Sequence, residues 1–259
     1  MENVKLKSKV KAYWEKHTPG LWNSSADKRS KRFFEEADKV REEHYSYISK
    51  LISSLKPRAK EVLEIGCGLG KDLMEFAKNG AIVTGTDLTE NAVSMTKRRF
   101  NLFNMKAEVY VDDAEKLLHT KKKFDIVYSN GVLHHTPDIQ KSIDNVYRVL
   151  KPNGKAVIML YAKGFHYYYC LILKKWLLEL NFLKMSKQQC VNKYTEFKGN
   201  SPLTKYYTIK EIHKIFRKFS SIKIRKYELG AKLERLIPLF LVPFVERKLG
   251  HHHIIIAEK

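Results

Sequence analysis

The chain has 259 residues, and 44% of them are hydrophobic. This is enough to form a buried core, which excludes a disordered chain. The formal net charge is +21, and residues 161–259 carry most of the surplus, with 20 Lys and Arg against 7 Asp and Glu. A basic surface attracts nucleic acid or an anionic membrane surface. The alternative is that scattered lysines simply solvate the surface, without any such partner.

Cysteine usage and the N-terminus indicate a cytoplasmic protein. Cys67, Cys170 and Cys190 lie far apart and form no Cys-x-x-Cys pair, so we expect free thiols in a reducing compartment. Residues 1–17 lack the apolar stretch of a signal peptide. Residues 165–183 are apolar, but they are too short and too charged to span a bilayer.

The first 56 residues read as helical. Apolar residues such as Phe33, Ala37, Val40 and Ile48 recur at steps of three or four, and Pro57 ends the pattern. We expect residues 1–57 to form a helical extension that acts as a lid.

From residue 58 the pattern changes to short β-rich runs that alternate with helical stretches. This alternation predicts an α/β fold with a parallel sheet covered on both faces, and we place its core at residues 58–162. A turn at 151–154 precedes the fifth strand. The predicted strands are 61–65, 81–86, 107–111, 124–129 and 155–161, and the predicted helices are 71–79, 90–103 and 139–149.

The last third, residues 163–259, breaks this alternation and reads as a cap with late strands. A mostly apolar helix is expected at 165–183 and an amphipathic one at 208–219. Runs at 221–229 and 251–258 predict strands that finish the sheet as an antiparallel edge around an insertion at 230–250. We read the histidines at 251–253 as strand residues and expect no metal site.

The strongest local signal is a glycine-rich turn between the first strand and the next helix. Gly66, Gly68 and Gly70 allow a sharp turn and a close approach of a ligand, and Cys67 lies among them. A nicotinamide-binding fold is an alternative, but its fingerprint places the third glycine one position later. Glu64 before the turn would repel a pyrophosphate, whereas it tolerates a cationic ligand such as a sulfonium-bearing amino acid.

Acidic residues follow the next two strands. Asp87 ends the second strand, where a carboxylate accepts both ribose hydroxyls of a nucleoside, and Leu88 lies beside it. Asp113 follows the third strand and is expected to bind the adenine amino group, with Ala114 keeping the pocket narrow. For both acids the alternative is helix capping.

Together with Asn130-Gly131 after the fourth strand, these segments resemble the class I methyltransferase family over residues 58–160. The resemblance implies a Rossmann-like seven-stranded sheet and S-adenosyl-L-methionine as the cofactor. Asn130 and Gly131 then form the loop beneath the methionine part. The family usually has a second glycine where this chain has Asn153. The implied cofactor-binding residues are Glu64, Gly66, Cys67, Gly68, Gly70, Asp87, Leu88, Asp113, Ala114, Asn130 and Gly131.

The flanking segments are similar to a subgroup of small-molecule methyltransferases. By that likeness Trp14 and Arg41 belong to the lid and to the site for the cofactor carboxylate, with ordinary packing as the alternative. The candidate substrate contacts are Tyr13, Tyr161, Lys205 and Tyr206.

His134 and His135 follow the fourth strand, where substrate meets cofactor in this family. Histidine titrates near neutral pH and suits a general base that takes the acceptor's proton. We expect one of the two, preferably His135, to be catalytic, and the other to be structural. No carboxylate cluster indicates a catalytic magnesium ion.

We therefore predict a methyltransferase that acts on an oxygen, nitrogen or carbon atom of a small molecule. Its tyrosine-rich cap would line an aromatic or lipid-like substrate pocket, or else form a dimer interface. An RNA-directed methyltransferase and a non-catalytic partner protein are the alternatives, and a nicotinamide oxidoreductase is a weaker one. The expected cap side chains are those of 165–169, Trp176, Phe182, Tyr206 and Tyr207.

Overall fold

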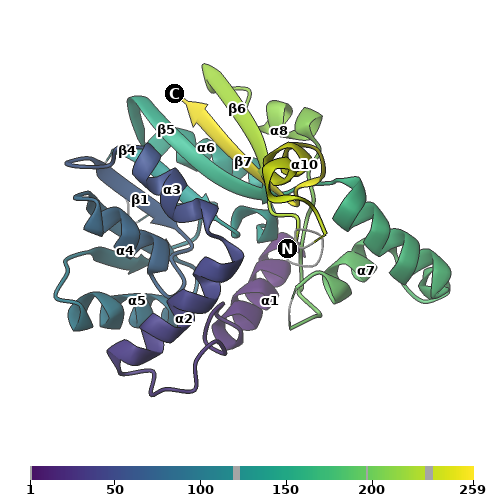
Figure 1. The fold of residues 1–259 in the computed structure, drawn as a ribbon, viewed down its shortest axis with the longest axis horizontal. Coiled ribbons are helices and arrows are strands. Elements are labelled where there is room, and N and C mark those ends of the chain that lie inside the picture. Colours follow the sequence, from purple (N-terminus) through teal and green to yellow (C-terminus); the bar gives the residue numbers. More distant parts are fainter. Residues whose placement is uncertain (1, 119–122, 197, 231–235) are drawn as a thin grey trace.

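A computed structural model describes residues 2–118, 123–196, 198–230 and 236–259. These residues form one seven-stranded sheet in the order β3-β2-β1-β4-β5-β7-β6 with helices on both faces (Figure 1). The predicted α/β class and the Rossmann-like sheet are confirmed. The strands are β1 Glu61–Ile65, β2 Ile82–Asp87, β3 Glu108–Val111, β4 Phe124–Asn130, β5 Leu150–Tyr161, β6 Ser221–Tyr227 and β7 His252–Glu258.

Strands β1 to β5 pair in parallel, and β7 runs antiparallel between β5 and β6. The prediction that two late strands complete the sheet in antiparallel pairing is therefore confirmed. Of these two strands, β7 lies inside the sheet and β6 forms its edge. The predicted turn at 151–154 lies within β5, where the pairing with β4 shifts register between Phe124 and Ile126. Asn153 occupies the left-handed region there, at φ 61°.

The buried side chains of the sheet alternate between two helical layers. Val62, Val83 and Ile126 pack beneath α3, α4 and α5, whereas Leu63 and Val127 pack beneath α6 and α8 on the other face. The helices are α1 Glu2–Lys16, α2 Lys31–His44, α3 Tyr47–Ser54, α4 Lys71–Lys78, α5 Glu90–Leu102, α6 Ile139–Val149, α7 Lys187–Tyr194, α8 Ile209–Ile215 and α10 Val242–Leu249.

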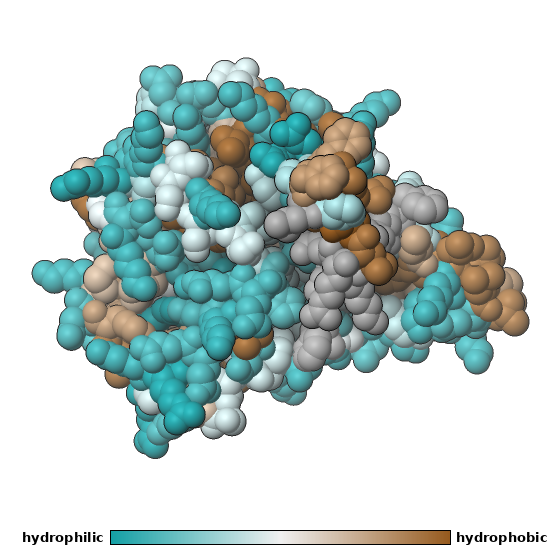
Figure 2. Space-filling view, in the orientation of Figure 1, coloured by the Kyte–Doolittle hydropathy of each residue, from teal (hydrophilic) through white to brown (hydrophobic). Residues whose placement is uncertain are grey.

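The predicted helix at 165–183 is formed without a break over residues 165–178, and it projects away from the body of the protein (Figure 1). It consists of the π-helical stretches η2 Phe165–Tyr169 and η3 Ile172–Leu178, joined by α-helical residues 170 and 171. The short 3-10 turn η4 Asn181–Leu183 follows, and a further short turn, η5, spans Leu239–Leu241. Figure 2 shows apolar side chains gathered at this projecting end. Residues 231–235 of the predicted insertion lie outside the described residues.

The N-terminal helices are partly built into the core. Phe33 and Phe34 of α2 are fully buried against Leu69 and Met95, and α3 packs on the sheet through Ile52. Of the three N-terminal helices, α1 is the least buried, with Val10 as its one buried residue among those described. Helix α1 therefore fits the predicted lid better than the rest of residues 1–57. The division of the chain into a lid (1–57), a core (58–162) and a cap (163–259) stays a prediction.

A buried arginine ties α2 to α5. Arg99 is 2% exposed, and its guanidinium donates to the Asp38 carboxylate of α2 and to the Leu69 carbonyl 3.2 Å away. Its charge also lies over the Phe34 ring, 5.3 Å from the centroid. Because both ends of this pair are withdrawn from water, removing one partner is costly.

We predict that Asp38→Ala lowers the free energy of unfolding by about 3 kcal/mol, because it leaves the buried Arg99 without its carboxylate. Urea denaturation followed by circular dichroism measures the change. The double variant Asp38→Ala with Arg99→Met is expected to recover much of the loss. Asp27→Ala, which removes an exposed pair with Arg29, serves as the matched control and should leave the melting temperature unchanged. A normal midpoint for Asp38→Ala alone would contradict this account.

Candidate functional site

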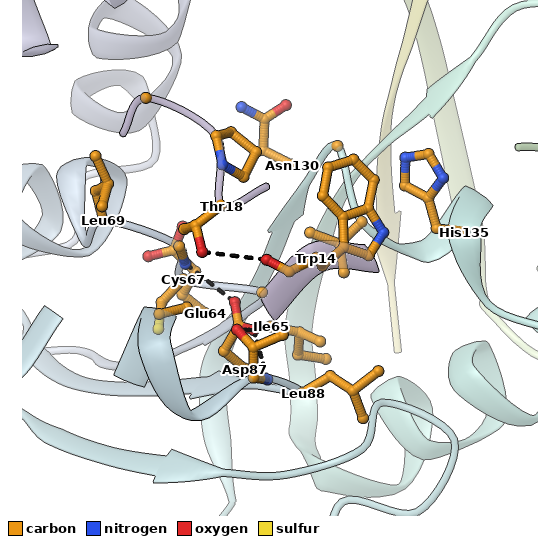
Figure 3. Close-up of a pocket in the computed structure, with 18 of the residues that line it drawn as sticks. Trp14, Thr18, Glu64, Ile65, Cys67, Leu69, Asp87, Leu88, Asn130 and His135 are labelled. Carbon is orange, nitrogen blue, oxygen red and sulfur yellow. Dashed lines mark hydrogen bonds between the residues drawn. The ribbon is translucent and has the colours of Figure 1, made fainter. Parts of the chain in front are cut away.

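A cavity of about 520 Å³ opens at the carboxyl ends of β1, β2 and β4, where open α/β sheets bind ligands. Its volume is in the range of small-molecule sites. The first three strands contribute Glu64, the turn 66–69, Asp87, Leu88 and the residues 112–115, and the loop after β4 contributes Asn130 and Gly131. Figure 3 shows Glu64 and Asp87 on one side of this cavity and the rings of Trp14 and His135 on the other.

Every residue predicted to bind the cofactor, except Gly70, lines this one cavity. The lining set includes Trp14 of α1 and Arg41 of α2, so side chains from separate segments meet there. Gly70 lies one step behind the wall, in the left-handed region at the start of α4, and a Cβ there would come within 2.9 Å of Thr96. The structure brings these predicted residues together, while their roles remain proposals.

The glycine turn is shaped by close contacts on one side and by open space on the other. Gly66 has φ +79°, and a Cβ on it would lie 2.2 Å from Val132. Gly68 has φ +55°, and nothing lies within 4 Å of the place where its Cβ would be. Gly66 is therefore required by the fold, whereas Gly68 leaves room for a ligand to approach the backbone.

The carboxylate of Asp87 is held by its own loop. Oδ2 accepts from the Gly68 amide at 3.1 Å, and Oδ1 accepts from the amide and hydroxyl of Thr89 at 2.9 and 2.8 Å. Burial raises the pKa of Asp87 above its usual value. Asp87 thus holds Thr89, the residue before α5, and does not cap an amide of the helix itself. The same carboxylate lines the cavity.

At the start of α5, directly after Thr89, the N-terminal amides are capped by α1. The Glu15 carboxylate accepts from the amides of Glu90 and Asn91 at 3.1 and 2.7 Å. Such a contact satisfies donors that a helix start leaves open. It therefore holds α1 across the mouth of the cavity.

A second contact of α1 lies beside the predicted adenine site. The Lys7 ammonium is 2.6 Å from a carboxylate oxygen of Asp113 and 2.6 Å from one of Glu115. Burial alone would lower the pKa of Lys7, but these two carboxylates raise it. Sequence reasoning missed Lys7, since one lysine among many in a basic helix gives no local signal.

Arg41 reaches the cavity from α2 and binds Asp72 of α4 through both terminal nitrogens. Burial would lower the pKa of Arg41, but the charge and hydrogen bonds of Asp72 raise it. Asp72 also accepts from the Tyr128 hydroxyl at 2.8 Å and from the Asn130 amide at 3.3 Å. Asp72 was not predicted as a site residue. Its negative charge offsets part of the positive charge of Arg41, which we expected to hold a cofactor carboxylate.

Two acceptor atoms in the cavity wall have no hydrogen-bond partner among the described residues. They are Oε2 of Glu64 and Oδ1 of Asn130, and both are buried. Burial, and then the charge of Asp72, raises the pKa of Glu64 well above its usual value. These atoms are suited to a ligand that brings hydrogen-bond donors and positive charge.

The predicted base His135 lines the cavity, with its ring 4.8 Å from that of Trp14. Its Nδ1 donates to the Leu203 carbonyl at 2.7 Å, and its Nε2 is 3.7 Å from Oε1 of Glu196. His134 is fully buried behind it and is not part of the cavity wall. His134 therefore has the packed position that we expected for one of the two histidines.

The four predicted substrate contacts lie behind the cavity wall. The Tyr161 ring stacks on His134 at 3.9 Å, and Tyr206 packs on Tyr161 at 5.4 Å. Tyr13 donates to the Gly199 carbonyl at 2.9 Å, and Lys205 donates to the Pro137 carbonyl at 2.8 Å. None of the four is among the residues that line the cavity, so direct contact with a substrate there would require movement.

The predicted pocket of cap side chains is not formed as expected. Phe182 is exposed, Trp176 is half-buried away from the cavity, and Tyr207 packs in the core between the sheet and α8. The reason is that η2 to η4 project outward and do not fold over the sheet. Of residues 165–169, the side chains of 165 and 166 lie outside the described residues.

Comparison with known proteins gives the family of the central part of the chain. Residues 63–158 match the family model described as a methyltransferase domain. The ubiquinone biosynthesis O-methyltransferase of Coxiella burnetii is 33% identical over 111 residues, which are 43% of this chain and 47% of the relative. The match thus spans about half the length of that relative.

Solved structures confirm the fold over nearly the whole chain. The magnesium protoporphyrin IX methyltransferase of Synechocystis PCC 6803, with S-adenosylhomocysteine bound, has a TM-score of 0.61 and 14% identity, and the superposition covers 98% of this chain and 99% of that one. The 4+2 cyclase SpnF has a TM-score of 0.59 and 14% identity, with 96% and 94% covered. Identities this low show a shared fold alone.

We predict different effects for alanine at two neighbouring glycines of the turn. Gly66→Ala should lower the free energy of unfolding by about 2–4 kcal/mol, because its Cβ overlaps Val132 at a left-handed φ. Gly68→Ala should cost only about 1 kcal/mol but should obstruct the ligand. Thermal melts and ligand titrations measure the two effects. Equal stability of the two variants would show that the contact with Val132 does not constrain the turn.

Proposed function

Because the chain contains a class I S-adenosylmethionine-dependent methyltransferase domain, we propose that it transfers a methyl group from S-adenosylmethionine to a small molecule. The acceptor atom is oxygen, nitrogen or carbon. The observation that carries the proposal is the convergence of the predicted cofactor residues on one cavity of about 520 Å³. The cofactor supplies an electrophilic methyl group on a sulfonium.

The residues of the cavity fit this cofactor at both ends. At the nucleoside end, Asp87 offers carboxylate oxygens to the ribose hydroxyls, and Asp113 is placed for the adenine amino group. At the amino-acid end, the unpartnered oxygens of Glu64 and Asn130 suit an ammonium group. The turn beside Gly68 leaves the space that an approaching ligand requires.

The acceptor end of the cavity lies at Trp14 and His135. The ring of Trp14 can hold a flat acceptor in position, and orientation of the reacting groups supplies much of the rate in such transfers. We place activation of the acceptor at His135, the predicted catalytic residue that reaches this wall. The similarity to a ubiquinone biosynthesis O-methyltransferase favours an oxygen acceptor.

The basic last third calls for a separate proposal on partners. The projecting segment exposes apolar side chains between lysines, a pattern typical of binding to an anionic membrane surface, and we favour this partner over nucleic acid. Among the described residues, no helix is long and apolar enough to cross a membrane. The exposed apolar residues are Tyr167, Tyr169, Leu173, Leu177, Leu178, Leu180, Phe182 and Leu183, and the exposed lysines are Lys174, Lys184 and Lys187.

We propose that the protein acts in the cytoplasm, and we support this by its three unpaired cysteines. Of these, Cys67 and Cys190 are buried and Cys170 is exposed. Homodimerisation through the projecting segment is the alternative use of its apolar surface.

We predict that S-adenosylmethionine and S-adenosylhomocysteine bind at micromolar concentration and that Asp87→Ala abolishes measurable binding. Glu64→Gln should weaken binding about 10-fold or more, through loss of a charge-assisted hydrogen bond, without lowering stability, because it removes a buried charge. Calorimetry measures the affinities, with the exposed Glu43→Gln as control. Displacement of the ligand by NADH, or no binding at all, would overturn the proposed function.

For the projecting segment, we predict that the protein co-sediments with vesicles that contain phosphatidylserine and not with neutral phosphatidylcholine vesicles. The double variant Leu178→Ser with Leu183→Ser should reduce the bound fraction several-fold, because it removes exposed apolar contacts. Sedimentation velocity is run in parallel without lipid. A concentration-dependent dimer that the same variant disrupts would assign the surface to self-association instead.

A further inference from the structure

Behind the acceptor end of the cavity, three side chains with metal-binding atoms converge. His134 and His135 lie on η1 Leu133–His135, directly after β4, and Glu196 follows α7. One ligand atom from each of the three lies within 4.8 Å of the others. They are the one such group of three found within the part of the chain that the structure describes.

The hydrogen bonds of His135 leave one nitrogen directed at a carboxylate. Because Nδ1 donates to the Leu203 carbonyl at 2.7 Å, Nε2 of the neutral ring carries a lone pair. That lone pair faces Oε1 of Glu196 at 3.7 Å, and this oxygen is buried without a hydrogen-bond partner among the described residues. Two acceptors facing each other repel, so this arrangement requires either a proton on Nε2 or a cation bound between the two atoms.

His134 completes the group. It is fully buried, and neither of its ring nitrogens makes a hydrogen bond of normal geometry with the described residues, although the Met159 backbone acts on it. An imidazole nitrogen is a common metal ligand.

We propose that His134, His135 and Glu196 bind one divalent transition-metal ion, with zinc as the best match. Two imidazoles and one carboxylate are a known set for a zinc site that keeps a fourth position open. Tetrahedral ligand atoms that lie about 2.0–2.2 Å from zinc are roughly 3.4 Å apart, so a pair at the 4.8 Å limit must approach by roughly 1.4 Å on binding. The hydrogen bond from His135 to the Leu203 carbonyl is the outer contact that orients a metal-binding histidine.

This proposal replaces the expectation, made from the sequence, that the chain has no metal site. The histidines at 251–253, which first raised the question, are not members of the group. Glu196 carries the only carboxylate of the group, and its position 61 residues after His135 gave no local signal.

The position of the site indicates the kind of acceptor, a step that rests on the proposed function. His135 lines the cavity beside Trp14, so an ion on its Nε2 lies next to the acceptor end. A divalent ion with an open position binds an oxygen and lowers the pKa of a hydroxyl there, and the proton passes to solvent. We therefore infer an acceptor with an ionisable oxygen, such as a phenol or an enol.

The test is metal analysis of the full, untagged chain. We expect about one zinc per chain by mass spectrometry after dialysis without chelator, and binding of one Co²⁺ with tetrahedral ligand-field bands after the zinc has been removed. Glu196→Gln keeps the side-chain shape and should weaken Co²⁺ binding at least 100-fold. His134→Asn is the second variant, and the exposed His213→Gln is the matched control, which should bind as the wild type does.

Binding of S-adenosylhomocysteine to each variant separates this proposal from the proposed function. Glu196 does not line the cavity, so Glu196→Gln should bind S-adenosylhomocysteine normally, which also shows that it is folded. A wild-type chain that holds no stoichiometric metal, or a Glu196→Gln variant with unchanged Co²⁺ binding, would overturn the metal site. Loss of S-adenosylhomocysteine binding in the wild type, with Co²⁺ still bound, would overturn only the methyltransferase proposal.

Discussion

The site depends on holding two buried carboxylates, Glu64 and Asp72, and the half-buried Asp87 around one cavity that Arg41 also lines. Arg41 is committed to Asp72, whose pKa it lowers against the effect of burial. The pKa values of Glu64 and Asp87 stay raised, because burial disfavours their ionised forms. A ligand with hydrogen-bond donors and positive charge stabilises those ionised forms.

That arrangement requires α2 to be fixed, since Arg41 comes from it. Phe33 and Phe34 anchor the helix in the core, and the pair of Asp38 with Arg99 adds a buried polar tie. Helix α1 is held differently, by Lys7 and Glu15, whose contacts are partly exposed ionic and capping interactions. If any part of the N-terminal extension opens to admit a ligand, these weaker contacts make α1 the part that moves.

The sequence predicted the sheet because its signals are local. Alternation of strand and helix, glycines at a turn and acids at strand ends are properties of short windows, and β1 and α6 were bounded to the residue. It failed where long-range packing decides. Residues 165–183 have the composition of a buried helix but project from the protein, and the turn at 151–154 is absorbed into β5 because β4 pairs on both sides of it.

The same distinction divides the site. Glu64, Asp87 and Asn130 could be found from motifs. Lys7, Asp72 and Glu196 act through partners at least 106, 31 and 61 residues away, which no motif records. The cofactor end is thus specified locally, and the acceptor end is assembled from distant segments. Since a methyltransferase and a cyclase share this fold, the chemistry of a member is decided at the acceptor end. In this chain we propose that this end is the wall of Trp14 and His135, with Glu196 behind it.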